Sequence, residues 1–234
     1  MKDNITWITG ASTGIGKELA YVFNENKKNI AVTARREELL KNIMKECSSN
    51  AQVLPIKMDV ADSKSVFETE KKISQKFNID CVINNAGVTS FTKAEDDSIE
   101  QIDEIINTNL LGSIYIIKSV LPNMIKNKKG TIVNILSAAA VKIFLQSSAY
   151  AASKAGLLTY TNVLREELRN YNIKVINIIP GATKTPIWPN SALEKYSERM
   201  MLPKDVANLI FNLTVLDKNM VPEEIVLKPI KGDL

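Results

Sequence analysis

Tyr150 and Lys154 stand four residues apart in the segment SAYAASKAGL, which covers positions 148–157. On a helix, side chains at positions i and i+4 lie on the same face and can meet. A phenol has a reference pKa of ~10 and exchanges protons poorly near neutral pH, but a nearby ammonium group lowers that pKa. The spacing therefore predicts an acid–base pair. A surface contact without chemical function would use the same spacing.

The sequence contains no histidine. This excludes a Ser-His-Asp triad, an HExxH zinc site and any imidazole acid–base step. Proton transfer near neutral pH must then come from tyrosine, lysine, cysteine or a carboxylate. Cys47 and Cys81 share no motif spacing, so the sequence supports neither a disulfide framework nor a thiolate metal site, and we expect no metal.

Three glycines, Gly10, Gly14 and Gly16, lie in ITGASTGIGKELAYVF, between a short apolar run and a helical pattern. Glycines at such a junction let the backbone approach the phosphates of a dinucleotide, and the helix N-terminus favours negative charge. The spacing is G-x-x-x-G-x-G rather than G-x-G-x-x-G, and a tight turn is the alternative. The position at the first strand–helix junction favours a nucleotide site.

The segment IAVTARREE ends the second apolar run in Ala34, Arg35 and Arg36. An acidic residue at this place would bind a free ribose 2′-hydroxyl, whereas a 2′-phosphate favours arginine. The missing acid and the guanidinium of Arg35 predict NADP(H), with NAD(H) the less favoured cofactor. The alternative is a solvated helix start, in which both arginines face the following glutamates.

Three further polar positions accompany strand ends or apolar faces. The turn NNAG at 84–87 follows the fourth apolar run, and Ser137 ends the segment TIVNILS, so both should face the same rim as the glycine turn. Asn109 lies on or beside an apolar helical stripe, where it either bonds neighbouring backbone or orders a water. Taken singly, NNAG could be only a turn and Ser137 only a cap.

The apolar pattern alternates between short and long periods along the whole chain. We predict strands at 5–9, 30–34, 53–57, 81–84, 131–136, 174–179 and 225–228. We predict helices at 15–26, 37–47, 63–77, 99–125, 148–171 and 203–216. This alternation indicates an α/β fold with a parallel sheet covered on both faces. We expect a single domain over 1–234, with 183–202 as a substrate-contacting loop or lid that carries a short helix.

Composition points to a soluble globular protein: 45% of the residues are hydrophobic and 24% are charged. Polar residues interrupt each apolar run before the roughly 18 residues that span a bilayer, and no secretory signal begins the chain, so we expect a cytoplasmic protein. The 30 basic and 26 acidic residues are scattered, which favours neither a nucleic-acid nor a membrane partner.

Six motifs together resemble the short-chain dehydrogenase/reductase family in order and spacing. They are TGASTGIG at 9–16, NNAG at 84–87, Asn109, Ser137, the pair Tyr150 and Lys154, and PGATKT at 180–185. The resemblance runs from residue 5 to at least 187, and PEEIVLKPI resembles the family's last strand. It implies one doubly wound Rossmann-type domain with a seven-stranded parallel sheet flanked by helices.

The resemblance also implies catalytic roles. Tyr150 would exchange the proton of the substrate oxygen, and Lys154 would lower its pKa and hold the nicotinamide ribose. Ser137 would bind the substrate oxygen together with Tyr150, while Asn109 would keep a water in a relay that reaches Lys154. Many members carry a pair of serines where this chain has Leu136 and Ser137, and often a glycine where it has Ala140. These departures affect the shape of the pocket rather than the chemistry.

The resemblance also implies which residues contact each part of the cofactor. The phosphate loop would use Gly10, Ser12, Thr13, Gly14, Ile15 and Gly16, and the 2′-phosphate would contact Arg35. The adenine would contact Asp59 and Val60, and the ribose and ring floor would contact Asn85, Ala86 and Gly87. The carboxamide and diphosphate would contact Pro180, Gly181, Thr183 and Thr185, with Tyr150 and Lys154 completing the set.

The expected function is an NADP(H)-dependent oxidoreductase that acts on a ketone, aldehyde or secondary alcohol, as a reductase in the cell. The alternatives are a 3-oxoacyl-[acyl-carrier-protein] reductase, a 3-hydroxy acid dehydrogenase and a non-catalytic NADP(H)-binding regulator. The partner is then a small carbonyl or alcohol substrate, and the resemblance implies a homotetramer or homodimer. The walls of the pocket are expected at 138–145 and 187–202, where aromatic and apolar side chains cluster.

Overall fold

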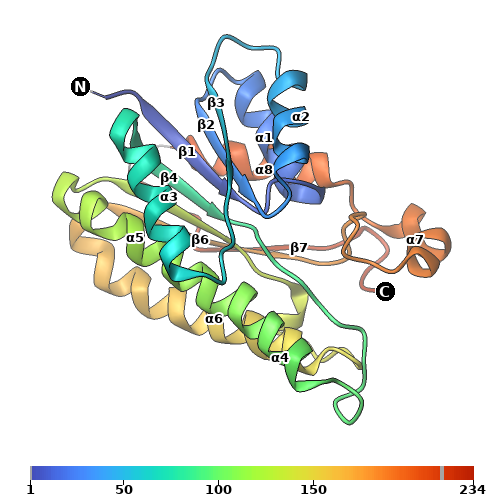
Figure 1. Ribbon diagram of the computed structural model, residues 1–234. Coiled ribbons are helices and arrows are strands. Elements are labelled where there is room, and N and C mark those ends of the chain that lie inside the picture. Colours follow the sequence, from blue (N-terminus) through green and yellow to red (C-terminus); the bar gives the residue numbers. More distant parts are fainter. Residues whose placement is uncertain (1, 217–218) are drawn as a thin grey trace.

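The computed structural model describes residues 2–216 and 219–234 and contains one sheet of seven parallel strands (Figure 1). The spatial order is β3-β2-β1-β4-β5-β6-β7. The strands are β1 Asn4–Thr9, β2 Ile30–Ala34, β3 Val53–Lys57, β4 Asn78–Asn84, β5 Gly130–Ile135, β6 Ile173–Pro180 and β7 Glu224–Leu227. The predicted Rossmann-type fold is confirmed, and each predicted strand is present within a few residues of its expected bounds.

Helices cover both faces of the sheet (Figure 1). One layer contains α1 (Gly14–Glu25), α2 (Glu37–Glu46) and α8 (Pro203–Thr214), and the other contains α3 (Ser63–Lys76), α5 (Gly112–Asn127) and α6 (Ser148–Leu168). Because both faces of a parallel sheet are buried, its strands read as nearly continuous apolar runs. Each face has its own core, so the strand ends are held rigidly from both sides.

The predicted helix 99–125 is divided into three parts. It begins as α4 (Ile99–Ile106), continues as a π-helical turn, η1 (Asn107–Leu111), and resumes as α5. The apolar period does not reveal such a turn, because it widens the helix by a single residue. The run Ile99–Asn127 has the length and composition of a membrane-crossing helix, yet half of its most apolar window is buried inside the fold, as in a core helix.

A ladder of buried asparagines crosses three central strands. Asn84, Asn134 and Asn177 are paired in register on β4, β5 and β6. The Asn84 amide donates to Asn134 Oδ1 at 2.9 Å, and the Asn134 amide donates to Asn177 Oδ1 at 3.0 Å. All three side chains are buried, so each bond replaces hydration that the interior cannot supply. The ladder fixes the relative register of the strands that end at the cleft.

The order in which strands are added to the sheet reverses between β1 and β4, which are neighbours in space. The chain leaves β1 toward one helical layer and leaves β4 toward the other, so a crevice opens at the carboxyl ends of these strands. Beyond β6, the segment 183–202 carries α7 (Asn190–Tyr196) and a 3₁₀ turn, η4 (Ser197–Arg199). A backbone bridge between Thr183 and Met201 closes this segment at its base.

Candidate active site

A cleft of about 870 Å³ lies at the carboxyl ends of the strands. Most of the residues predicted from the sequence line it, although they come from seven separate segments of the chain. These are Gly10, Ser12, Thr13, Gly14, Ile15, Arg35, Asp59, Val60, Asn85, Ala86, Gly87, Ser137, Tyr150, Lys154, Pro180, Gly181, Thr183 and Thr185. Two predicted residues, Gly16 and Asn109, do not line the cleft.

The glycine turn leaves an open, electropositive surface at the start of α1. Gly10 and Gly14 adopt φ angles of +62° and +58°, which favour glycine, and a Cβ at Gly10 would lie 2.6 Å from the Ala86 Cα. Thr13 precedes α1 without a side-chain cap, and the first turn carries no acidic residue. The free amide groups and the helix dipole therefore fit an anionic diphosphate. Gly16 packs directly against this turn, because a Cβ at position 16 would collide with the Asn85 side chain and the Gly10 carbonyl.

The two arginines after β2 take different partners. The Arg35 guanidinium forms an ion pair with Glu104 of α4 at 3.1 Å, and its side chain is 58% exposed. The Arg36 guanidinium donates to Ser12 Oγ at 2.9 Å and contacts Thr13 Oγ1 at 3.5 Å. Both arginines line the cleft beside small Ala34 and give this end a positive charge, and Arg36 is the one oriented toward the glycine turn.

Tyr150 and Ser137 meet at the centre of the cleft. Tyr150 stands in the first turn of α6, and Ser137 follows β5 and accepts a hydrogen bond from the Ala139 amide at 3.1 Å. Burial raises the pKa of the Tyr150 phenol, and its hydrogen bond with Ser137 acts in the opposite direction. The phenol is therefore protonated at neutral pH and can donate a proton to an oxygen placed beside Ser137.

Lys154 lies one turn along α6, as the spacing predicted. It is 4% exposed, donates to the Ile135 carbonyl at 2.8 Å, and its ammonium lies 5.8 Å from the centre of the Tyr150 ring. Burial lowers the pKa of Lys154 to about 8. We expected Lys154 to lower the pKa of Tyr150, but burial raises the phenol pKa, and the group that acts against this rise is Ser137 rather than Lys154.

Asn109 is fully buried in the π-helical turn, behind the cleft rather than in its wall. Its Oδ1 accepts from the Val88 amide at 2.8 Å, and its Nδ2 donates to the Val88 carbonyl at 2.9 Å and to Ser153 Oγ at 3.0 Å. The sequence left two interpretations open, a bond to neighbouring backbone or the ordering of a water. The structure shows the first, because Asn109 bonds the backbone of Val88. It fixes the loop that leaves β4.

The comparisons with known proteins place this geometry in a family. Residues 4–195 match the family model described as short chain dehydrogenase. The chain belongs to the short-chain dehydrogenase family. Dehydrogenase/reductase SDR family member 7 of Mus musculus is 32% identical over 207 residues, which cover 86% of this chain but only 61% of the mouse protein.

Two further comparisons cover nearly the whole chain. An uncharacterized oxidoreductase of Staphylococcus aureus (strain USA300) is 29% identical over 231 residues, or 98% of this chain and 99% of that protein. The closed form of a serine dehydrogenase complexed with NADP⁺ has a TM-score of 0.91 and 25% identity, and covers 98% of this chain and 96% of its own. Oxidoreductase chemistry with a nicotinamide cofactor is thus supported.

Several cleft residues of this short-chain dehydrogenase were not assigned from the sequence. Arg36 adjoins the predicted Arg35, and only the direction of its side chain distinguishes the two. Phe91 belongs to the loop after β4, and Asp233 comes from the far end of the chain. No motif marks either residue. Among the described residues, no group of three or more His, Cys, Asp or Glu side chains could hold a metal ion.

Proposed function

We propose that this protein is an NADP(H)-dependent oxidoreductase that reduces a ketone or aldehyde to the alcohol. One observation carries the proposal: the phenol of Tyr150, the hydroxyl of Ser137 and the buried Lys154 share one cleft with an uncapped, glycine-bounded helix N-terminus. The chemistry supplied by the bound cofactor is hydride donation from nicotinamide C4 to the substrate carbon.

The side chains of the cleft would divide the remaining work. Ser137 donates a hydrogen bond to the substrate oxygen as negative charge develops there. Tyr150 donates its proton to the same oxygen, and its raised pKa keeps the phenol in the protonated form that reduction needs. Lys154 holds the ribose hydroxyls of the nicotinamide half, close to Gly87. We assign Asn109 as a positioning residue, because it acts through Val88 and Ser153.

The preference for NADP(H) rests on the charge at the far end of the cleft. Arg35 and Arg36 line it, and the second strand ends in Ala34 rather than in an acid that would repel a 2′-phosphate. The NADP⁺ complex of the serine dehydrogenase, which shares the fold over nearly the whole chain, agrees with this assignment.

The test is the oxidation of NADPH and NADH by the purified protein across a panel of ketones and aldehydes. Tyr150→Phe removes only the hydroxyl and should lower kcat by at least about a hundredfold, because general acid catalysis contributes about that factor or more. Tyr160→Phe makes the same change on α6 outside the cleft and serves as the control. Equal activity of wild type and Tyr150→Phe would refute the mechanism.

The same panel separates the alternatives. A 3-oxoacyl thioester and a 3-hydroxy acid test the two other dehydrogenase activities, and NADPH binding without turnover of any substrate would favour the non-catalytic regulator.

We also propose that the protein is a homodimer or homotetramer, because apolar Val163 on α6 and Val226 on β7 are more than half exposed. Light scattering measures the assembly directly.

A further inference from the structure

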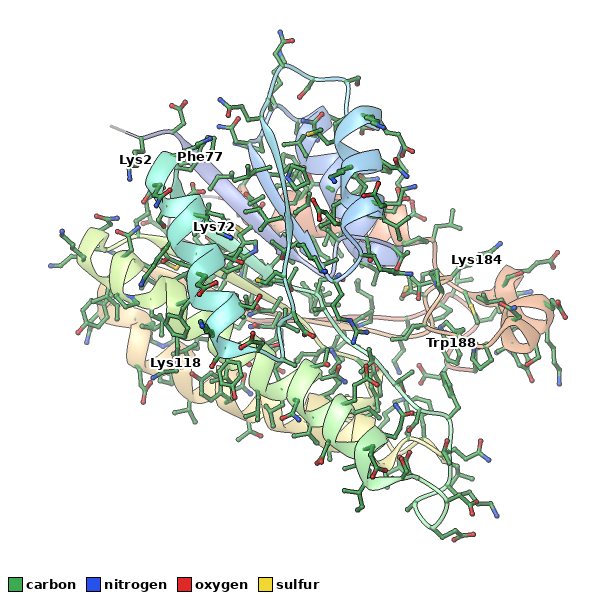
Figure 2. The ribbon with its side chains drawn as sticks, in the orientation of Figure 1. Lys2, Lys72, Phe77, Lys118, Lys184 and Trp188 are labelled. Atoms are coloured by element: carbon green, nitrogen blue, oxygen red, sulfur yellow. The ribbon has the colours of Figure 1, made fainter. Side chains whose placement is uncertain are left out.

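Two aromatic rings from separate loops stack in the wall of the cleft. The ring centres of Phe91 and Trp188 lie 5.3 Å apart, and their planes meet at 26°. Phe91 comes from the loop after β4. Trp188, which is labelled in Figure 2, comes from the segment after β6. Since β5 lies between these strands, the stack joins the loops on either side of the strand that leads to Ser137.

The loops that carry the two rings are held by bonds that do not depend on a ligand. The Trp188 indole donates to the Thr183 carbonyl at 3.1 Å, and its backbone amide donates to the Thr185 carbonyl at 3.3 Å. On the other side, Asn109 holds Val88, three residues before Phe91. The two faces of the stack are therefore pre-organised, so a ring that packs against them loses little additional freedom.

The rest of this end of the cleft is apolar. We define the aromatic end as the lining residues Phe91, Phe144, Leu145, Ile187, Trp188 and Tyr196. Ser147, the residue just before α6, donates from its Oγ to the Phe144 carbonyl at 2.7 Å and so joins Phe144 to the start of that helix. Leu145 is 90% exposed, so the mouth of the aromatic end presents apolar surface to solvent.

Charge is distributed unevenly along the cleft. Among the described residues that line it, the basic ones are Arg35, Arg36 and Lys154, and none of these belongs to the aromatic end. Asp233 lines the cleft, but its carboxylate accepts from Lys142 at 2.5 Å and lies 3.6 Å from the Lys228 ammonium, so its charge is compensated and its pKa is lowered. The ammonium of Lys195 lies 5.0 Å from the centre of the Tyr196 ring, but within the described part of the chain no lysine or arginine lines the aromatic end itself. A substrate carboxylate packed there would lose its hydration without a direct ion-pair partner.

We propose that the substrate carbonyl carries a neutral aromatic substituent, which packs against the Phe91–Trp188 stack. The inference rests on the proposed reductase function and adds the substrate class. It excludes small carboxylate-bearing carbonyls, such as keto acids, as good substrates. Stacking on the rings provides affinity, and the missing cation provides the discrimination.

The first test compares two aldehydes of nearly equal shape that differ in charge, methyl 4-formylbenzoate and 4-formylbenzoate. With NADPH and the wild-type protein, we expect kcat/KM for the neutral ester to exceed that for the carboxylate by about tenfold or more. Equal or better turnover of the carboxylate would overturn the inference.

The second test removes the stack. Trp188→Ala should lower kcat/KM for the neutral ester by about tenfold, while propanal, which is too small to reach the rings, should change by less than about twofold. Trp188→Phe keeps a ring and should retain most of the activity toward the ester. Parallel titrations with NADPH check that Trp188→Ala binds the cofactor as the wild type does. Equal losses for the ester and propanal would indicate a structural role and overturn the inference.

The third test adds the missing cation. Leu145 is exposed at the mouth, so Leu145→Lys should fold normally and should raise kcat/KM for 4-formylbenzoate by about two- to fivefold, the range of an exposed ion pair. No gain would contradict the explanation from charge. Failure of the wild type to reduce any aldehyde would refute the proposed function itself, whereas reduction of propanal but of neither aromatic aldehyde would refute only the inference.

Discussion

Arg36 and Arg35 allow a sharp prediction, because adjacent residues with the same side chain differ in their partners. The Arg36 guanidinium donates to Ser12 at 2.9 Å and lines the cleft beside Ala34, where we assign it to the 2′-phosphate of NADPH. Arg35 is engaged by Glu104 at 3.1 Å. We predict that Arg36→Ala weakens the binding of NADPH far more than Arg35→Ala does, and that neither changes the binding of NADH by much.

The magnitude follows from the geometry. A charge-assisted hydrogen bond contributes about 1.5–3 kcal/mol, or about 10- to 100-fold in Kd, and exposure to solvent places Arg36 near the lower value. Arg35 must first leave Glu104, an exposed pair worth up to about 1 kcal/mol, so its loss should cost only about two- to fivefold. Conversely, Glu104→Gln frees Arg35 and should tighten NADPH binding by a few fold.

The assay is a fluorescence titration of reduced cofactor by each purified variant, at low and at physiological salt. The contribution of an exposed guanidinium should decrease with salt, because screening weakens it. Arg→Lys at position 36 tests whether planar geometry matters in addition to charge. If Arg36→Ala weakened NADPH and NADH equally, or if Arg35→Ala had the larger effect, the assignment of Arg36 to the 2′-phosphate would be wrong.

Two further predictions concern buried polar groups. Asn134→Ala removes the middle of the asparagine ladder and leaves the Asn84 amide without its partner. Urea denaturation should therefore show a loss of about 2–4 kcal/mol in the free energy of unfolding. The control Asn127→Ala, at an exposed position, should lower this free energy by less than about 1 kcal/mol. Lys154 has a folded pKa of about 8, below its ordinary value of 10.5, so the unfolded chain binds more protons between these values and stability should rise with pH. The free energy of unfolding of the wild type relative to Lys154→Met should therefore increase from about pH 7 to about pH 10, by up to about 3 kcal/mol; a difference independent of pH would refute the lowered pKa.

The fold was predictable because its determinants are local and repeated. A parallel sheet buried on both faces requires short β-branched runs, and each crossover requires a helix with one apolar face. The helix spacing of Tyr150 and Lys154 and the glycine turn at the first strand–helix junction are likewise local features, and each lies beside the cleft as expected. The π-helical turn escaped prediction, because one extra residue per turn barely changes an apolar period.

The sequence alone determined which residue types were present for chemistry: without histidine, proton transfer had to fall to a group such as the Tyr150 phenol. Only the tertiary structure decided how these groups are used. It pairs Arg35 with Glu104, directs Arg36 to Ser12, and buries Tyr150 so that the phenol pKa rises. It also joins Phe91 to Trp188, which stand 97 positions apart in the chain. These outcomes depend on distance and desolvation between residues that are remote in sequence, and no local pattern records either quantity.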